Sequence, residues 1–123
     1  MFRMFLVGLA VAAMAPVASV AAADVTGTWT ASFETQVGQQ NYTYQFQQKG
    51  AELTGTAKSN FGEAKLENGK VDGDTVTFVE LLDFQGMQLR IEYTGKVVSA
   101  DEIKFSRKVA DIATEELVAK RTK

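Results

Sequence analysis

The sequence predicts an all-β protein, an eight-stranded antiparallel up-and-down barrel, on three observations. From Val25 onward apolar residues alternate with polar ones, turn residues recur about every ten positions, and the only proline, Pro16, precedes this region. A period of two is typical of strands with one buried face, and short connections favour antiparallel neighbours. Closing the sheet removes the exposed edges that an open sheet must protect. A two-layer sandwich is the alternative, because periodicity alone does not separate the two.

The first four strands are expected over residues 25–35, 40–48, 52–59 and 63–71. Their alternation turns these side chains inward: Trp29, Ala31, Phe33, Tyr42, Tyr44, Phe46, Leu53, Gly55 and Ala57. The fourth strand is the least regular, because it contains Asn68-Gly69 just before the better hairpin signal at Asp72-Gly73-Asp74. We therefore expect a bulge at Asn68-Gly69.

The last four strands are expected over residues 75–84, 87–97, 102–109 and 114–121. Gln85-Gly86 forms a two-residue hairpin loop, which fixes the register of the fifth and sixth strands. Phe84 then pairs with Met87, Leu82 with Leu89, Glu80 with Ile91, and Phe78 with Tyr93. The same alternation turns these residues of the last two strands inward: Ile103, Phe105, Arg107, Val109, Leu117, Ala119 and Arg121. Glu80 and Arg107 are the two charged residues that this pattern places in an apolar setting.

The N-terminal segment has the layout of a cleavable export signal. Arg3 supplies a positive charge, an apolar run extends over residues 4–15, and Ala21-x-Ala23 supplies the small residues of a cleavage site. The apolar run is shorter than the roughly 20 residues of a membrane-spanning helix. We expect residues 1–23 to be removed, residues 24–123 to form a single β-barrel domain, and the mature protein to be secreted or periplasmic in a bacterium, with no membrane segment.

The composition excludes several function classes. Histidine and cysteine are absent, which removes Ser-His-Asp hydrolases, thiol chemistry, disulfides and cysteine ligation of metals. Residues 24–123 carry twelve Lys and Arg, the thirteen of the chain less Arg3, against fifteen Asp and Glu, a net charge of −3. An acidic chain argues against nucleic-acid binding, which needs basic patches. We expect no cofactor, no metal site and no nucleic-acid partner.

Gly27-Thr28-Trp29, Leu53-Thr54-Gly55 and a late Arg121 resemble the calycin group of lipocalins, fatty-acid-binding proteins and avidins. That resemblance implies a structural pair at the closed end of the barrel, with Arg121 of the last strand lying across Trp29 of the first. A guanidinium over an indole contributes on the order of 1 kcal/mol. The hairpins look most like those of avidins, but biotin binding is not expected, because Trp29 is the only tryptophan.

The chain also resembles a group of small secreted bacterial proteins. The shared features are the Gly-Thr-Trp start, the segment Phe78-Val79-Glu80 and the tail over residues 113–121. Related segments occur beside secreted glycoside hydrolases and esterases, so this resemblance implies an accessory module and transfers no mechanism.

Glu80 is the sharpest candidate for a functional residue. An unpaired carboxylate among apolar side chains is costly, so Glu80 should be partnered, protonated or near the barrel mouth. A Glu80–Arg107 pair inside the barrel is the preferred resolution. It either orients a polar ligand or is a structural ion pair, and a bulge that turns Glu80 outward is the other possibility.

The candidate ligand-binding residues combine this pair with an inward aromatic lining. They are Tyr42, Tyr44, Phe46, Glu80, Tyr93, Phe105 and Arg107. Such a lining suits a small apolar or aromatic ligand or a sugar ring, although in a narrow barrel it serves equally as packed core. The glutamines beside it are interpreted as a solvated outer surface: Gln39, Gln40, Gln45, Gln47 and Gln48.

The leading hypothesis is a non-catalytic small-ligand-binding or accessory barrel, with its site at the end away from Trp29. A carboxylate-based glycoside hydrolase is one alternative, using Glu80 with Asp83 or Glu92, but the predicted register turns Glu80 away from those two. A protein-interaction scaffold is another, with an outward apolar patch of Val79, Leu81 and Val118.

Overall fold

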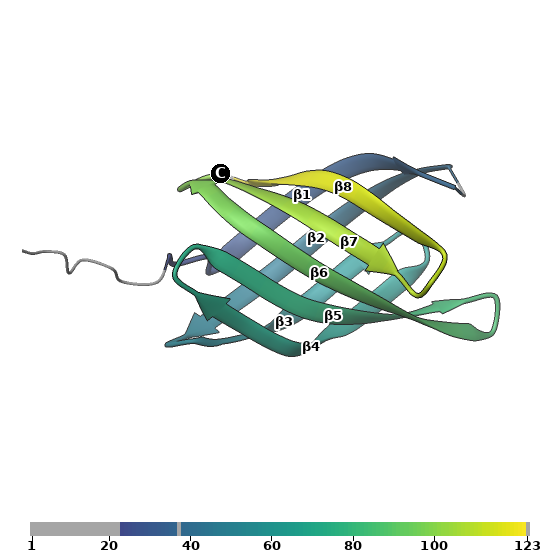
Figure 1. Ribbon diagram of the computed structural model, residues 1–123, viewed down its shortest axis with the longest axis horizontal. Helices are drawn as coiled ribbons and strands as arrows, with labels where there is room; N and C mark the ends of the chain where they lie inside the picture. Colours follow the sequence, from purple (N-terminus) through teal and green to yellow (C-terminus); the bar gives the residue numbers. More distant parts are fainter. Residues whose placement is uncertain (1–22, 37, 123) are drawn as a thin grey trace, which may run out of the picture.

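The computed structural model describes residues 23–36 and 38–122, which form a closed antiparallel barrel of eight strands and no helix (Figure 1). The strands are β1 (Gly27–Thr35), β2 (Gly38–Lys49), β3 (Glu52–Ser59), β4 (Gly62–Asp72), β5 (Thr75–Phe84), β6 (Met87–Ser99), β7 (Glu102–Val109) and β8 (Ala113–Arg121). Each strand pairs with the next, and β1 pairs with β8. The predicted barrel is confirmed, and the sandwich is excluded. Residues 1–22 of the predicted export signal lie outside the described residues.

The predicted strand bounds differ from the observed ones by two residues at most. The largest differences are two residues each: β1 begins at Gly27 rather than Val25, β2 begins at Gly38 rather than Gln40, and β6 ends at Ser99 rather than Val97. Val25 and Thr26 leave the sheet because they turn across the end of the barrel, where Val25 is buried. The segment before β1 therefore covers part of the barrel end, and β1 itself begins at Gly27.

The predicted irregularity in β4 is confirmed. The register between β4 and β5 shifts between Glu67 and Lys70, and Asn68 has a positive φ of 52°. A Cβ on Gly69 would lie 2.1 Å from the Leu53 carbonyl oxygen of β3. Glycine at this position lets the bulged backbone approach the neighbouring strand.

The β5–β6 hairpin has the predicted register, from Phe84 opposite Met87 through Leu82–Leu89 and Glu80–Ile91 to Phe78–Tyr93. This hairpin projects beyond the other turns at its end of the barrel (Figure 1). Glu80 consequently faces inward, and the bulge that would turn it outward is excluded.

Aromatic rings fill the middle of the barrel. Tyr44 stacks on Tyr42 and Phe46 at centroid distances of 5.3 and 5.7 Å, and it meets Tyr93 edge-on at 5.8 Å. Gly95 of β6 makes room for this packing, because a Cβ there would lie 2.4 Å from the Phe105 ring. The centre of the barrel is thus packed core.

The closed end is sealed by Trp29, Arg121 and the segment before β1. The Arg121 guanidinium lies 4.5 Å from the Trp29 ring centroid, as the resemblance to calycins implied, and the two residues are partners in the β1–β8 register. The Trp29 indole N–H donates to the Val25 carbonyl at 2.9 Å. Arg121 donates to the carbonyls of Asp24, Thr26 and Ala100 at 3.0, 2.6 and 2.9 Å.

The seam between β1 and β8 is short. Its register consists of Trp29–Arg121 and Thr30–Lys120, both near the closed end. Farther along, a groove lined by residues including Ala31 and Leu117 separates the two strands. β1 and β8 are therefore paired in the sheet near the closed end of the barrel, and the pairing does not continue toward the open end.

The predicted outward patch is wrong in part. Val79 is buried at 6% exposure, Leu81 is half-buried, and Val118 is exposed. Val79 faces outward, since it is absent from the buried core cluster, and its partners in register are the exposed residues Glu67 and Glu92. The described surface therefore has no continuous apolar patch made of these three residues.

Candidate functional site

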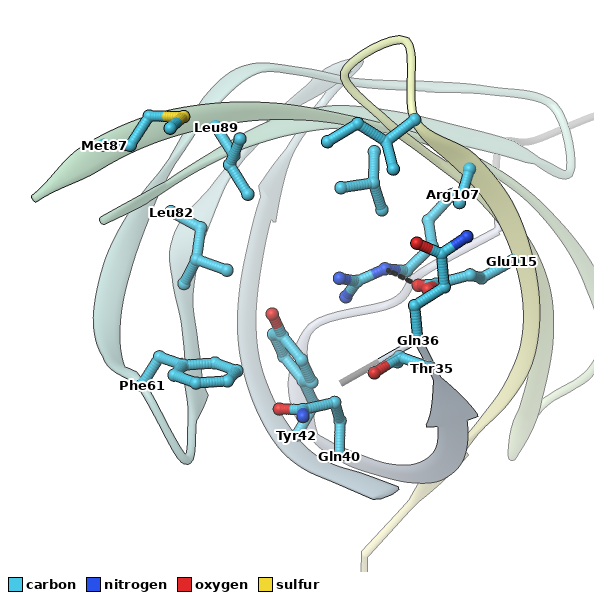
Figure 2. Close-up of a pocket in the computed structure, with 13 residues that line it drawn as sticks. Thr35, Gln36, Gln40, Tyr42, Phe61, Leu82, Met87, Leu89, Arg107 and Glu115 are labelled. Carbon is cyan, nitrogen blue, oxygen red and sulfur yellow. Dashed lines mark ion pairs between the residues drawn. The ribbon is translucent and has the colours of Figure 1, made fainter. Parts of the chain in front are cut away.

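A pocket of about 220 Å³ opens at the end of the barrel opposite Trp29 and Arg121. The four turns at this end surround it: β1–β2, β3–β4, β5–β6 and β7–β8. Its apolar wall consists of Phe61, Leu82, Met87, Leu89, Val109, Ile112 and Ala113. Its polar wall consists of Thr35, Gln36, Gln40, Tyr42, Arg107 and Glu115. Figure 2 shows the two walls facing each other, with the leucines and Met87 on one side and Arg107, Glu115 and Gln36 on the other.

Strand alternation explains how these residues reach the pocket. Tyr42 and Gln40 occupy successive inward positions of β2, and Arg107 and Val109 do so on β7. Each of these pairs lies where its strand approaches the open end. The pocket is therefore the upper part of the barrel interior, above the packed aromatic rings.

Glu80 lies directly beneath this pocket and is fully buried. Its carboxylate accepts hydrogen bonds from the Tyr42 hydroxyl at 2.8 Å and the Tyr93 hydroxyl at 2.9 Å. The predicted partner, Arg107, is farther away, with Nη1 3.9 Å from Oε1. Burial raises the pKa of Glu80, and the hydrogen bonds and Arg107 oppose that rise. Two phenols, rather than Arg107, are the main partners of this carboxylate.

The hydrogen bonds of the tyrosine hydroxyls all point toward the Glu80 carboxylate. Tyr93 gives its proton to Glu80, so the 3.0 Å contact between the Tyr44 and Tyr93 hydroxyls requires Tyr44 as donor. Tyr93 oxygen also accepts from Arg107 Nη1 at 2.7 Å. Burial and the neighbouring Glu80 raise the pKa of Tyr42 to about 12, so Tyr42 stays a neutral donor.

Arg107 extends from β7 toward the middle of the pocket (Figure 2). Its guanidinium carbon lies 5.0 Å from the ring centroids of Phe33 and Tyr42, which is the range of a cation–π contact. Nε lies 2.9 Å from Glu115 Oε1, an ion pair between side chains that are 4% and 12% exposed. That contact lacks hydrogen-bond geometry, and neither atom has another hydrogen-bond partner in the described part of the chain.

Glu115 and Gln40 line the pocket but were not predicted as site residues, and both could have been found from alternation. Glu115 has the same parity as Leu117 and Ala119, so it faces inward on β8 beside Arg107 in register. Gln40 has the same parity as Tyr42. The prediction that Gln40 belongs to a solvated outer surface is wrong, because its side chain is 3% exposed and lines the pocket.

The structure separates the predicted ligand-binding residues into two groups. Tyr42 and Arg107 line the pocket. The others are packed in the core below it: Tyr44, Phe46, Glu80, Tyr93 and Phe105. A pocket is present at the open end, and Tyr44, Glu80 and Tyr93 lie beneath it rather than in its wall.

The carboxylates considered for glycoside hydrolysis do not face one another. Glu80 is inside the barrel, whereas Asp83 and Glu92 are exposed on the outer surface, where Glu92 forms an ion pair with Arg90 at 3.2 Å. Within residues 23–36 and 38–122, no cluster of three or more acidic side chains could hold a metal ion. The same residues form no helix long and apolar enough to cross a membrane.

No known protein family matches the chain, and no curated protein matches its sequence. Two solved structures are similar to it in fold. One is a redesigned β-barrel, mFAP1, bound to DFHBI, with a TM-score of 0.58 and 13% identity over 80% of this chain and 94% of that chain. Another is EF1p2_mFAP2b bound to DFHBI, with a TM-score of 0.52, the same identity and the same coverage. The likeness establishes an eight-stranded barrel of the same architecture.

Proposed function

We propose that this protein is a non-catalytic binding protein that takes a small, largely apolar ligand into the open end of its barrel. The observation that carries the proposal is the pocket of about 220 Å³, in which an apolar wall faces a few polar side chains. Ligand sites in proteins commonly combine these two features. The two barrels of similar fold were each solved with a bound molecule, DFHBI, so an architecture of this kind can hold a ligand.

The rim of the pocket supports the same function. Met87 and Ile112 are 62% and 61% exposed, and they lie on different hairpins at the open end. Exposed apolar side chains around a cavity are typical of a ligand-binding site, where the bound ligand covers them. The rim is thus suited to admitting an apolar molecule.

Catalysis is not part of the proposal. The buried Glu80 is bonded to two phenols, and Glu115 is paired with Arg107, so neither carboxylate is placed as a free acid or base. We further propose that the protein works outside the cytoplasm, as an exported relative of calycins or an accessory module. That proposal rests on the predicted export signal and on the sequence resemblances.

The test is a titration of the purified protein with 2-naphthol, followed by amide NMR shifts. We expect shifts at the open end, including Leu89 and Val109, and none at Trp29. A Leu89→Trp substitution should fill the pocket and weaken binding at least tenfold. Val98→Trp is the matched control, because Val98 lies on the same strand but is 49% exposed on its outer face.

Shifts confined to the outer surface, or unchanged binding in the Leu89→Trp variant, would overturn the proposal. Native mass spectrometry of the protein from its own host adds a second readout. A retained mass that the Leu89→Trp variant lacks would identify the natural ligand.

A further inference from the structure

The Gln40 amide is an unusual feature of the pocket. The residue is 97% buried, and its Oε1 has no hydrogen-bond partner among the described residues. Gln40 occupies the inward position of β2 next to Tyr42, on the side of the open end, and it lines the pocket (Figure 2). A buried carbonyl oxygen without a donor costs free energy that a core of apolar residues would not. The position is therefore poor for stability and suited to receiving a donor.

Arg107, by contrast, is not available to an anionic ligand. Two carboxylates already surround its single positive charge, Glu115 at 2.9 Å and Glu80 at 3.9 Å. Tyr93 and the rings of Phe33 and Tyr42 occupy other sides of the guanidinium. An incoming carboxylate or phosphate would have to displace Glu115 or lie beside it, and like charges in a buried site repel strongly.

The size of the pocket limits the ligand as well. About 220 Å³ is below the roughly 300–1,000 Å³ typical of pockets for drug-sized molecules. One or two fused rings can enter, with an apolar face against Leu82 and Leu89 and an edge toward β2 and β7. Three buried polar atoms at that edge lack hydrogen-bond partners in the described part of the chain, and two of them, Arg107 Nε and Glu115 Oε1, face each other at 2.9 Å. The third, the Gln40 amide oxygen, has no donor opposite it.

From these observations we propose that the ligand is a small uncharged aromatic molecule with a hydrogen-bond donor, such as a hydroxyl, that Gln40 accepts. This inference rests on the proposed binding function and specifies its ligand class. Gln40 is the residue that determines specificity, and Arg107 with Glu115 forms a neutralised wall that excludes anions.

The test uses four probes that share the naphthalene ring and differ in one substituent: 2-naphthol, 2-methoxynaphthalene, 2-naphthoate and 2-naphthylmethylammonium. Their dissociation constants are measured by calorimetry or NMR at pH 7. We expect 2-naphthol to bind about fivefold more tightly than 2-methoxynaphthalene, which lacks the donor. Both charged probes should bind at least tenfold more weakly than 2-naphthol, because a charged group of either sign loses its hydration on entering a mostly apolar pocket.

Gln40→Met removes the acceptor while keeping the length of the side chain. It should reduce the preference for 2-naphthol over 2-methoxynaphthalene to less than twofold without abolishing binding. Gln39→Met is the matched control, because Gln39 is the exposed neighbour on the same strand, and it should leave the preference unchanged. Gln40→Leu serves if the methionine variant does not fold, and the wild-type probe series is informative without either.

The outcomes separate the two proposals. If no naphthalene binds at the open end, the proposed function fails. If the probes bind there but without donor preference, or if Gln40→Met keeps the preference, the binding function stands and the role of Gln40 is overturned. Tightest binding by 2-naphthoate or by the ammonium probe would overturn the uncharged ligand class.

Discussion

The two ends of the barrel each contain an inward arginine over aromatic rings, and the two arginines are used differently. At the closed end, Arg121 donates to three backbone carbonyls and ties the segment before β1 over Trp29. At the open end, Arg107 faces two carboxylates, and neither contact has hydrogen-bond geometry. The nearby amide oxygen of Gln40 has no partner among the described residues. Satisfied polar groups lie at the end that stabilises the fold, and unsatisfied ones lie at the end where we propose that the ligand binds.

The largest expected effect is the loss of Trp29. The Trp29→Ala substitution should lower the free energy of unfolding by about 3–5 kcal/mol, because a fully buried indole leaves a cavity at the seal. Met87→Ala at the open rim, where the side chain is 62% exposed, should change it by less than about 0.5 kcal/mol. Urea unfolding measures both, and equal losses at the two ends would contradict the comparison.

A smaller effect is expected for Arg121→Lys. A lysine keeps a positive charge over Trp29, but one ammonium cannot reach the three carbonyls that the guanidinium reaches. The free energy of unfolding should fall by about 1–2 kcal/mol, and the affinity for 2-naphthol should stay within twofold. A fivefold change in that affinity would show that the closed end controls the pocket.

The smallest effect concerns the pH dependence at Glu80. Burial raises the pKa of this carboxyl in the folded state above its ordinary value of 4.5, so the unfolded chain ionises first as pH rises. The folded state then binds more protons, and the contribution of Glu80 to stability decreases from pH 4.5 until the pH passes the folded pKa. The slope is at most about 1.4 kcal/mol per pH unit.

Glu80→Gln should remove this part of the pH dependence, as measured by urea unfolding between pH 4 and 8. Glu92→Gln, which makes the same change at an exposed position on the next strand, is the matched control variant. If the free energy of unfolding of the wild type instead increases relative to that of Glu80→Gln as pH rises, the raised pKa is contradicted.

The sequence predicted most of the frame, because strand alternation and hairpin loops act locally. Gln85-Gly86 determined the whole β5–β6 register, and Asn68-Gly69 marked the bulge. Alternation also placed Glu80 and Arg107 inside the barrel. It did not predict which partner each charge takes, since that depends on side-chain lengths across several strands, and Tyr42 and Tyr93 turned out to be nearer to Glu80 than Arg107 is.

The site was harder to predict than the frame. Gln40 and Glu115 were overlooked because polar residues are ordinarily assigned to the solvent side, although their parity with Tyr42 and Leu117 places them inside. The boundary between packed core and pocket also has no local signal. Whether a ring such as Tyr44 or Tyr42 meets empty space depends on how much volume the opposite strands contribute.

The short β1–β8 seam has a consequence for how the barrel assembles. Seven strand pairs join neighbours along the chain, whereas the seam brings together Trp29 and Arg121, from opposite ends of the barrel sequence. Closing so long a loop costs more chain entropy than forming a hairpin, and contacts of this kind slow folding. We therefore expect a curved sheet of hairpins to form first and the seam to close last. Amide hydrogen exchange should accordingly be fastest along the half of β1 and β8 that faces the pocket.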